Sequence, residues 1–216
     1  MEAVLPLAGF GFALGWPLEW VIQRFPQGVG TAPSSRRRWV VAAITALLFA
    51  LEAVSIGIEP ELLPALLLTA LVVPAAAIDL EHRIIPDLIN LPGAVAVYVV
   101  SVAVAPDRWL ELLLGGLGCF LFFFVAHMIY PKGMGMGDVK MALMIGLGLG
   151  SAAFLALFMA FMASTALSMF LIATRGRKGL KVGVPFGPFL AFGGIVALLY
   201  GPELIDWYER ISGLSS

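Results

Sequence analysis

Long apolar stretches follow one another through almost the whole of this chain. Hydrophobic residues make up 61% of its 216 residues and charged residues only 12%, and the mean hydropathy is +0.99. Soluble domains are about 45–50% apolar and about 25% charged, so this composition predicts a membrane protein. A bilayer-spanning helix needs roughly 17–25 largely apolar residues. Eight stretches are candidates, at 3–22, 39–58, 62–78, 88–105, 109–130, 139–150, 151–174 and 184–201. The predicted fold is an all-α polytopic membrane protein with about eight transmembrane helices.

The sixth stretch, VKMALMIGLGLG, is short and glycine-rich, and the placement of positive charge indicates whether it crosses. With eight spans and an outer N-terminus, 11 of the 13 Lys and Arg residues fall on the cytoplasmic side, and only Arg108 and Arg210 fall outside. This bias follows the positive-inside rule. Without the sixth crossing, the cations of RGRKGLK would move outside, so eight crossings are predicted. The net charge of −1 gives no reason to expect a nucleic-acid partner.

This topology places three polar connections at the cytoplasmic face. DLEHRIIPD joins the third and fourth spans, GMGMGD joins the fifth and sixth, and GRKGLKVGVPFGP joins the last two. Polar residues that gather at one face from distant parts of a chain predict a functional site.

Two aspartates belong to these connections, since Asp79 ends the third span and Asp138 begins the sixth. A carboxylate at membrane depth costs a few kcal/mol on insertion scales, so it usually faces a cavity or a partner. Two carboxyl groups that meet can share one proton, and the ionised one then activates water while the protonated one polarises a scissile carbonyl. Gly135 and Gly137 would let substrate and backbone approach closely. The residues alone leave open a helix cap for Asp138 and a solvated helix end for Asp79.

IDLEHRIIPD and GMGDVKMALMIGLGLG together resemble the type IV prepilin peptidases, which are aspartic proteases of the GxGD class. VPFGPFLAFGGIVALLYG resembles the closing segment of that family, and all three elements stand in the family's order. The resemblance implies that Asp79 and Asp138 are the catalytic pair. It also implies prepilin-like membrane precursors as substrates, cut after a glycine, and a site that faces the cytoplasm of a prokaryotic cell membrane. Aspartic chemistry requires neither a metal nor another cofactor.

Three other polar residues, Asp87, Lys140 and Glu52, are predicted to have supporting rather than catalytic roles. Asp87, in IIPD, also matches the family motif, but it precedes an apolar stretch and is predicted to cap the fourth helix. Lys140 would either tune a neighbouring carboxylate or contact lipid headgroups, and contact with membrane lipid is favoured. Glu52, deep in the second span, would either line the site or pair with another polar group.

The N-terminal part departs from the family. Many members begin with a segment like GSFLNVVIYRLP and continue with a loop of two CxxC pairs, which is tied to zinc binding and to methylation of the product. This chain has GWPLEWVIQRFP and a short loop without cysteine, and Cys119 is its only cysteine. The sequence therefore predicts a two-helix region at 1–61 with a degenerate motif, a peptidase region at 62–216, and neither zinc nor methyl transfer.

Two other classes of function remain as alternatives. In a polytopic transporter, Asp79, Asp138 and Glu52 would form a proton relay. A proton relay of this kind would need acidic residues at several depths of the membrane, whereas Asp79 and Asp138 are both predicted at one face. A catalytically silent scaffold would have no use for two aspartates with flanking glycines.

Overall fold

The computed structural model describes residues 4–24, 35–131, 133–176 and 184–212, with the backbone alone for 15–24, 35–38 and 202–212. Lys132 and most of the predicted loops after the first and seventh spans lie outside these residues. Within the described ranges the chain forms eight α-helices and two short 3-10 helices. They are α1 Val4–Arg24, α2 Ser35–Ser55, α3 Leu62–His82, α4 Asp87–Val104, η1 Pro106–Arg108, α5 Trp109–Ile129, α6 Met136–Leu149, η2 Gly150–Ala152, α7 Ala153–Arg175 and α8 Gly187–Ser212.

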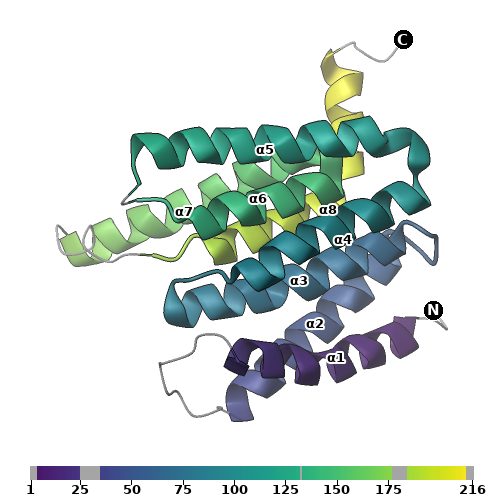
Figure 1. Ribbon diagram of the computed structural model, residues 1–216, viewed down its shortest axis with the longest axis horizontal. Coiled ribbons are helices and arrows are strands. Elements are labelled where there is room, and N and C mark those ends of the chain that lie inside the picture. The colour runs from purple at the N-terminus through teal and green to yellow at the C-terminus, as the bar shows by residue number, and fades with distance from the viewer. Residues whose placement is uncertain (1–3, 25–34, 132, 177–183, 213–216) are drawn as a thin grey trace.

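The helices from α3 to α8 lie side by side, and α1 and α2 form a hairpin that packs against α3 (Figure 1). The connection from α3 to α4, the connection from α5 to α6 and the start of α8 all lie at the left end of this view. The predicted gathering at one end is therefore confirmed for the first two connections and for residues 184–188 of the third, whose residues 177–183 lie outside the described part of the chain.

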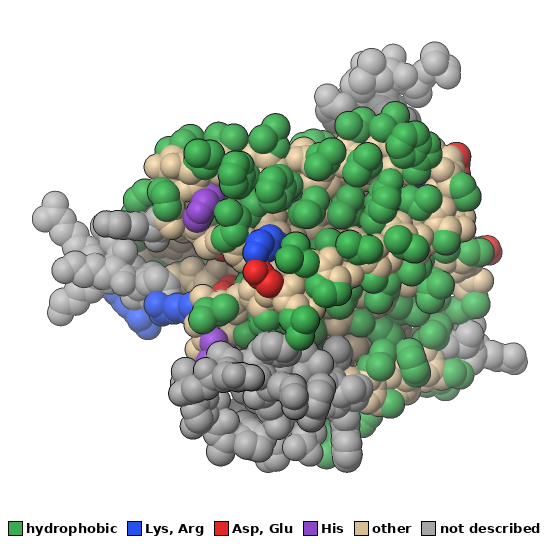
Figure 2. Space-filling view, in the orientation of Figure 1, with side chains coloured by type: hydrophobic (Ala, Val, Ile, Leu, Met, Phe, Trp, Pro, Cys, Tyr) green, Lys and Arg blue, Asp and Glu red, His purple; other side chains and the backbone are tan. Residues whose placement is uncertain are grey.

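The surface of this bundle suits lipid. Among the described residues, four helical segments are long and apolar enough to cross a membrane: Leu62–His82, Asp87–Val104, Pro106–Ile129 and Met136–Arg175. Three further apolar helical stretches are shorter, at Val4–Leu14, Trp39–Ser55 and Gly187–Gly201. Hydrophobic side chains cover most of the face shown in Figure 2, where few charged side chains interrupt them. The prediction of an all-α polytopic membrane protein is confirmed.

The short helix α6 lies at the centre of the bundle. It contacts α3, α4, α5, α7 and α8, and Val139, Met141 and Ile145 are fully buried. Its 14 residues extend about 21 Å, less than the roughly 30 Å of a hydrocarbon core. Close packing against α5 is possible because small residues meet there: a Cβ on Gly146 would lie 2.6 Å from the carbonyl oxygen of Gly115. Other helices, rather than lipid, surround α6.

The chain reverses direction between α6 and α7. Gly150 has a φ of 61°, a conformation that favours glycine, and η2 follows it. Ala152, the last residue of η2, lies beside Gly201, and Ala156 on α7 lies beside Gly193, so α7 runs antiparallel to α8. The predicted boundary between the sixth and seventh spans, at residues 150 and 151, falls at this reversal.

Candidate active site

Asp79 lies in the last turns of α3 and is 5% exposed. The backbone N–H of Gly187, the first residue of α8, donates a hydrogen bond of 2.8 Å to Oδ2 of Asp79. The first N–H groups of a helix have no partner within the helix, so a carboxylate is well placed to accept from them. A Cβ on Gly187 would stand only 2.7 Å from that same oxygen. Glycine is therefore required where α8 approaches Asp79.

Asp138 is held in a similar way at the start of α6. It is the third residue of the helix, and its Oδ2 accepts a hydrogen bond of 3.2 Å from the backbone N–H of Gly135, as in a capping box. Its Oδ1 is buried and has no hydrogen-bond partner among the described residues. The helix-capping interpretation of Asp138 is thus correct for one oxygen, while the other remains available for chemistry.

The structure brings the two aspartates together. They are close enough for the charge of Asp79 to act directly on Asp138. Ile85, in the connection between α3 and α4, fills the space beside them and is 6% exposed. A Cβ on Gly137 would lie 3.0 Å from Cβ of Ile85, and a Cβ on Gly187 would lie 3.0 Å from its Cδ1. Three segments that are distant in sequence therefore meet at Ile85.

Asn90 is a site residue that sequence reasoning missed. It lies in the first turns of α4, is fully buried, and donates a hydrogen bond of 3.0 Å from Nδ2 to the carbonyl oxygen of Gly137. That carbonyl belongs to the peptide that joins Gly137 to Asp138. Oδ1 of Asn90 is a second buried acceptor without a partner in the described part of the chain. The available signal was a polar amide in the apolar stretch LINLPG, since a buried amide needs a partner.

His127, near the end of α5, contacts the loop that leads into α6. Its Nδ1 lies 2.7 Å from the carbonyl oxygen of Met134, and a carbonyl can only accept, so this nitrogen carries the proton. The loop that leads into α6 is thus hydrogen-bonded to α5 through His127 and to α4 through Asn90.

Asp87 and Lys140 form an ion pair, which corrects the role predicted for Asp87 and gives Lys140 a neighbouring carboxylate, one of the two contacts predicted for it. Pro86 occupies the position before α4, Asp87 is the first residue of the helix, and no side chain caps this end. Nζ of Lys140 instead lies 2.6 Å from Oδ2 of Asp87. The preceding proline places Asp87 inside the helix, where its carboxylate points to α6. The prediction that Asp87 caps the helix is wrong, and Lys140 binds a carboxylate rather than lipid alone.

Glu52 pairs with a polar group, one of the two roles predicted for it. Its fully buried carboxyl group accepts a hydrogen bond from the hydroxyl of Thr69, which joins α2 to α3. Thr69 precedes Asp79 by ten residues on the same helix, a rise of about 15 Å. Glu52 is therefore remote from the two aspartates.

Comparison with known proteins identifies the family. Residues 65–174 match the sequence pattern described as the "Type IV leader peptidase family". The chain belongs to this family. Membership indicates a protease, and the matched region contains Asp79, Asn90 and Asp138.

Three curated relatives bear the name "Prepilin leader peptidase/N-methyltransferase". The one from Bacillus subtilis is 34% identical over 172 residues, which cover 78% of this chain and 68% of the relative. The one from Aeromonas hydrophila is 32% identical over 82% of this chain and 63% of its own length. The one from Pseudomonas aeruginosa is 28% identical over 84% and 64%, respectively. The chain thus spans about two thirds of the length of these relatives. No solved structure matches it.

Proposed function

We propose that this chain is an aspartic endopeptidase that removes the short basic leader from prepilin-like precursors at the cytoplasmic face of a cell membrane. One observation supports it above all: Asp79 and Asp138 lie at the same end of the bundle, near enough for their charges to interact, and each is held through one oxygen by a backbone N–H at the start of a helix. Family membership and the names of the relatives support the substrate class.

The geometry suits a shared-proton mechanism. Two carboxyl groups that come into contact share one proton, because two like charges in a partly buried site repel each other. The ionised carboxylate takes a proton from water as the water attacks the scissile carbonyl, and the protonated carboxyl donates a hydrogen bond to the carbonyl oxygen. Oδ1 of Asp138 is buried and has no hydrogen-bond partner among the described residues, so it is the oxygen that could accept the proton from water.

The surroundings of the site suit a substrate that lies partly in lipid. Leu80, Ile84 and Leu88 are 62%, 57% and 63% exposed, and they lie at the same end of the bundle as Asp79. A precursor whose leader is followed by a hydrophobic helix would place that helix in the adjacent lipid and its cleavage site beside the aspartates. Gly135, which is exposed just before α6, leaves room for an extended peptide beside Asp138, whereas Gly137 lets α6 pack against Ile85.

The transporter alternative receives no comparable support. A relay through Glu52 requires contact with the aspartates, whereas Glu52 bonds to Thr69 at another depth.

Co-expression with candidate precursors tests the proposed substrate class. The candidates are pilins, pseudopilins of secretion or competence, and archaellin-like precursors, and leader removal is measured by gel shift and mass spectrometry. We expect cleavage after a glycine that precedes the hydrophobic segment. A matched precursor with valine in place of that glycine should remain uncut. Failure to cut any precursor, or cleavage inside the hydrophobic segment, would contradict the proposal.

A further inference from the structure

A cavity of about 450 Å³ opens at the end of the bundle opposite the aspartates. Its position follows from its walls, which are the last residues of α2, α4 and α6 and the first residues of α3 and α5, together with the middle of α8. The aspartates lie at the other ends of α3 and α6. The volume falls within the range of about 300–1,000 Å³ for small-molecule sites. The cavity is therefore separate from the peptidase site.

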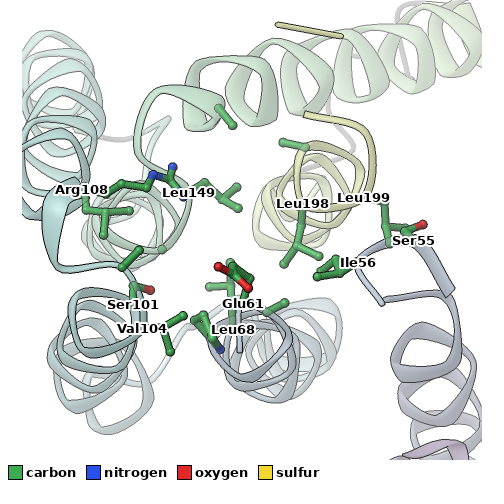
Figure 3. A pocket seen from close by; sticks show the side chains of 17 residues that line it. Ser55, Ile56, Glu61, Leu68, Ser101, Val104, Arg108, Leu149, Leu198 and Leu199 are labelled. Atoms are coloured by element: carbon green, nitrogen blue, oxygen red, sulfur yellow. The ribbon is translucent and has the colours of Figure 1, made fainter. Parts of the chain in front are cut away.

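The deep walls of this cavity are apolar. They include Leu68, Leu112, Leu149, Ala197 and Leu198, which are all at most 9% exposed. Ser101 interrupts this lining on α4 (Figure 3). It is 5% exposed, and its hydroxyl has no hydrogen-bond partner among the described residues. A buried hydroxyl without a partner is destabilising, so a ligand that brings a hydrogen-bond acceptor to this depth would be favoured.

Two oppositely charged side chains line the mouth of the cavity, and Glu111 and Asp107 lie beside the positive one. Glu61, just before α3, and Arg108, just before α5, reach over the opening from different sides (Figure 3). Arg108 donates from Nε and one Nη to Glu111, at 2.9 and 3.2 Å. A guanidinium has five N–H donors, so three remain for another anion. Glu61 influences Arg108 only as a nearby charge.

The polar groups are arranged by depth. Ala105, at the C-terminal end of α4, lies near the mouth with Arg108, and Ser101 lies four residues further in, about 6 Å along the helix. Leu68 and Leu149 line the apolar part. From the mouth inward, the order is a charged pair, a hydroxyl donor and an apolar chamber. This is the order of headgroup, ester carbonyl and acyl chain in a phospholipid.

We propose that this cavity binds a zwitterionic phospholipid. Its phosphate contacts Arg108, its ammonium contacts Glu61, an ester carbonyl accepts from Ser101, and one acyl chain fills the apolar chamber. Opposite charges at one mouth favour a zwitterion over an anionic lipid, because an anionic headgroup would leave Glu61 facing like charge. The site is independent of the peptidase reaction.

Photocrosslinking in a bilayer tests the site. The full chain is reconstituted in nanodiscs with phosphatidylethanolamine that carries a diazirine near the end of one acyl chain, and labelled residues are mapped by mass spectrometry. We expect labels at Leu68, Leu149 and Leu198. Ser101→Phe fills the chamber and removes the hydroxyl, so it should lower this labelling about tenfold, as expected for a loss of about 1.4 kcal/mol. Val99→Phe, on the same helix but 57% exposed, is the matched control and should label normally.

Headgroup charge provides a second test that does not depend on the cavity-filling variant. Glu61→Gln should abolish the preference for phosphatidylethanolamine over phosphatidylglycerol, whereas Glu59→Gln, an exposed acid that does not line the cavity, should retain it. The proposal is overturned if the unmodified protein labels equally with both lipids, or if labels appear only on outward residues such as Val95. Unchanged labelling in Ser101→Phe would also overturn it.

Discussion

At Gly187 the backbone of α8 touches the carboxyl group of Asp79, and no space remains for a methyl group. Gly187→Ala should displace that carboxyl group and reduce leader cleavage by about 100-fold, the cost of a misplacement of roughly 1 Å in an active site. Gly194→Ala, on the same helix, is the matched control, since its Cβ would meet Ile145 at an ordinary 3.5 Å. Cleavage of a precursor at equal enzyme levels is the measurement. Equal activity in the two variants would show that the contact between Gly187 and Asp79 has no catalytic importance.

Asn90 permits a second test on a single hydrogen bond. Asn90→Leu removes the side-chain donor to the carbonyl of Gly137, a hydrogen bond worth about 0.5–1.5 kcal/mol, and loosens the peptide that precedes Asp138. We expect kcat to fall at least about tenfold while KM changes little, because the residue positions a catalytic group. Tyr98→Phe, also on α4, removes a side-chain hydrogen bond to the backbone carbonyl of Trp109 at the opposite end of the bundle, and it should leave cleavage unchanged. A rise in KM alone would instead place Asn90 in substrate binding.

From the sequence, a candidate residue can be assigned where one motif determines it, but not where two distant segments must come together. Asp79 and Asp138 could be found from their positions at span ends and from the GxGD motif. The partner of Asp87 could not, because Lys140 is 53 residues away and only the packing of α4 on α6 brings them together. Asn90 was overlooked for the same reason. Its role appears only when the carbonyl of Gly137 is placed against it.

Helices were predicted more accurately than their ends. The third span was expected to stop at 78, but α3 continues to His82, and Arg83 then adopts a left-handed conformation with φ of 55°. The predicted span ended before Asp79 because the apolar stretch ends there, whereas the backbone hydrogen bonds of the helix continue past this residue. The helix extension matters, because it places Asp79 inside a helix with a fixed orientation rather than in a loop. The short α6 was predicted to cross the membrane from charge alone, and this stays a prediction. Its enclosure by other helices is what would let so few residues suffice.

The orientation of these helices in the membrane is a prediction that labelling can test. Cysteines are placed at Ile84, between α3 and α4, and at Ile58, between α2 and α3, in a Cys119→Ala background. Both positions are well exposed, at 57% and 61%, and they lie at opposite ends of the bundle. The distribution of positive charge predicts that an impermeant thiol reagent in intact cells labels the cysteine at 58 and spares the one at 84. The reverse pattern would place the aspartates outside the cell and invert the topology.

For the molecule as a whole, the curated relatives carry two activities in their names, and we expect this chain to perform only one. Its loop between the first two helices has no cysteine, so neither thiolate zinc binding nor the associated methyl transfer is expected. The purified protein is analysed for zinc, and its cleaved product is weighed by mass spectrometry after incubation with S-adenosylmethionine. The product should have a free amine. The Bacillus subtilis relative serves as the control, and a mass gain of one methyl group with this chain alone would refute the expectation.

The central claim is that Asp79 and Asp138 act as one catalytic unit, and their asparagine variants test it most directly. Asparagine keeps the shape of aspartate but cannot ionise or share a proton, so Asp79→Asn and Asp138→Asn should each abolish leader removal from a co-expressed precursor. The double variant should be no worse than either single one, because the two residues act together.

Asp87→Asn is the matched control in the same experiment. It removes only a partly exposed ion pair, worth about 0–1 kcal/mol, so most activity should remain. All variants are compared at matched membrane levels. The account predicts no cleavage with either catalytic variant and clear cleavage with Asp87→Asn. Cleavage by both Asp79→Asn and Asp138→Asn would contradict the aspartic mechanism, and loss in Asp87→Asn with retention in Asp79→Asn would make Asp87 the partner of Asp138.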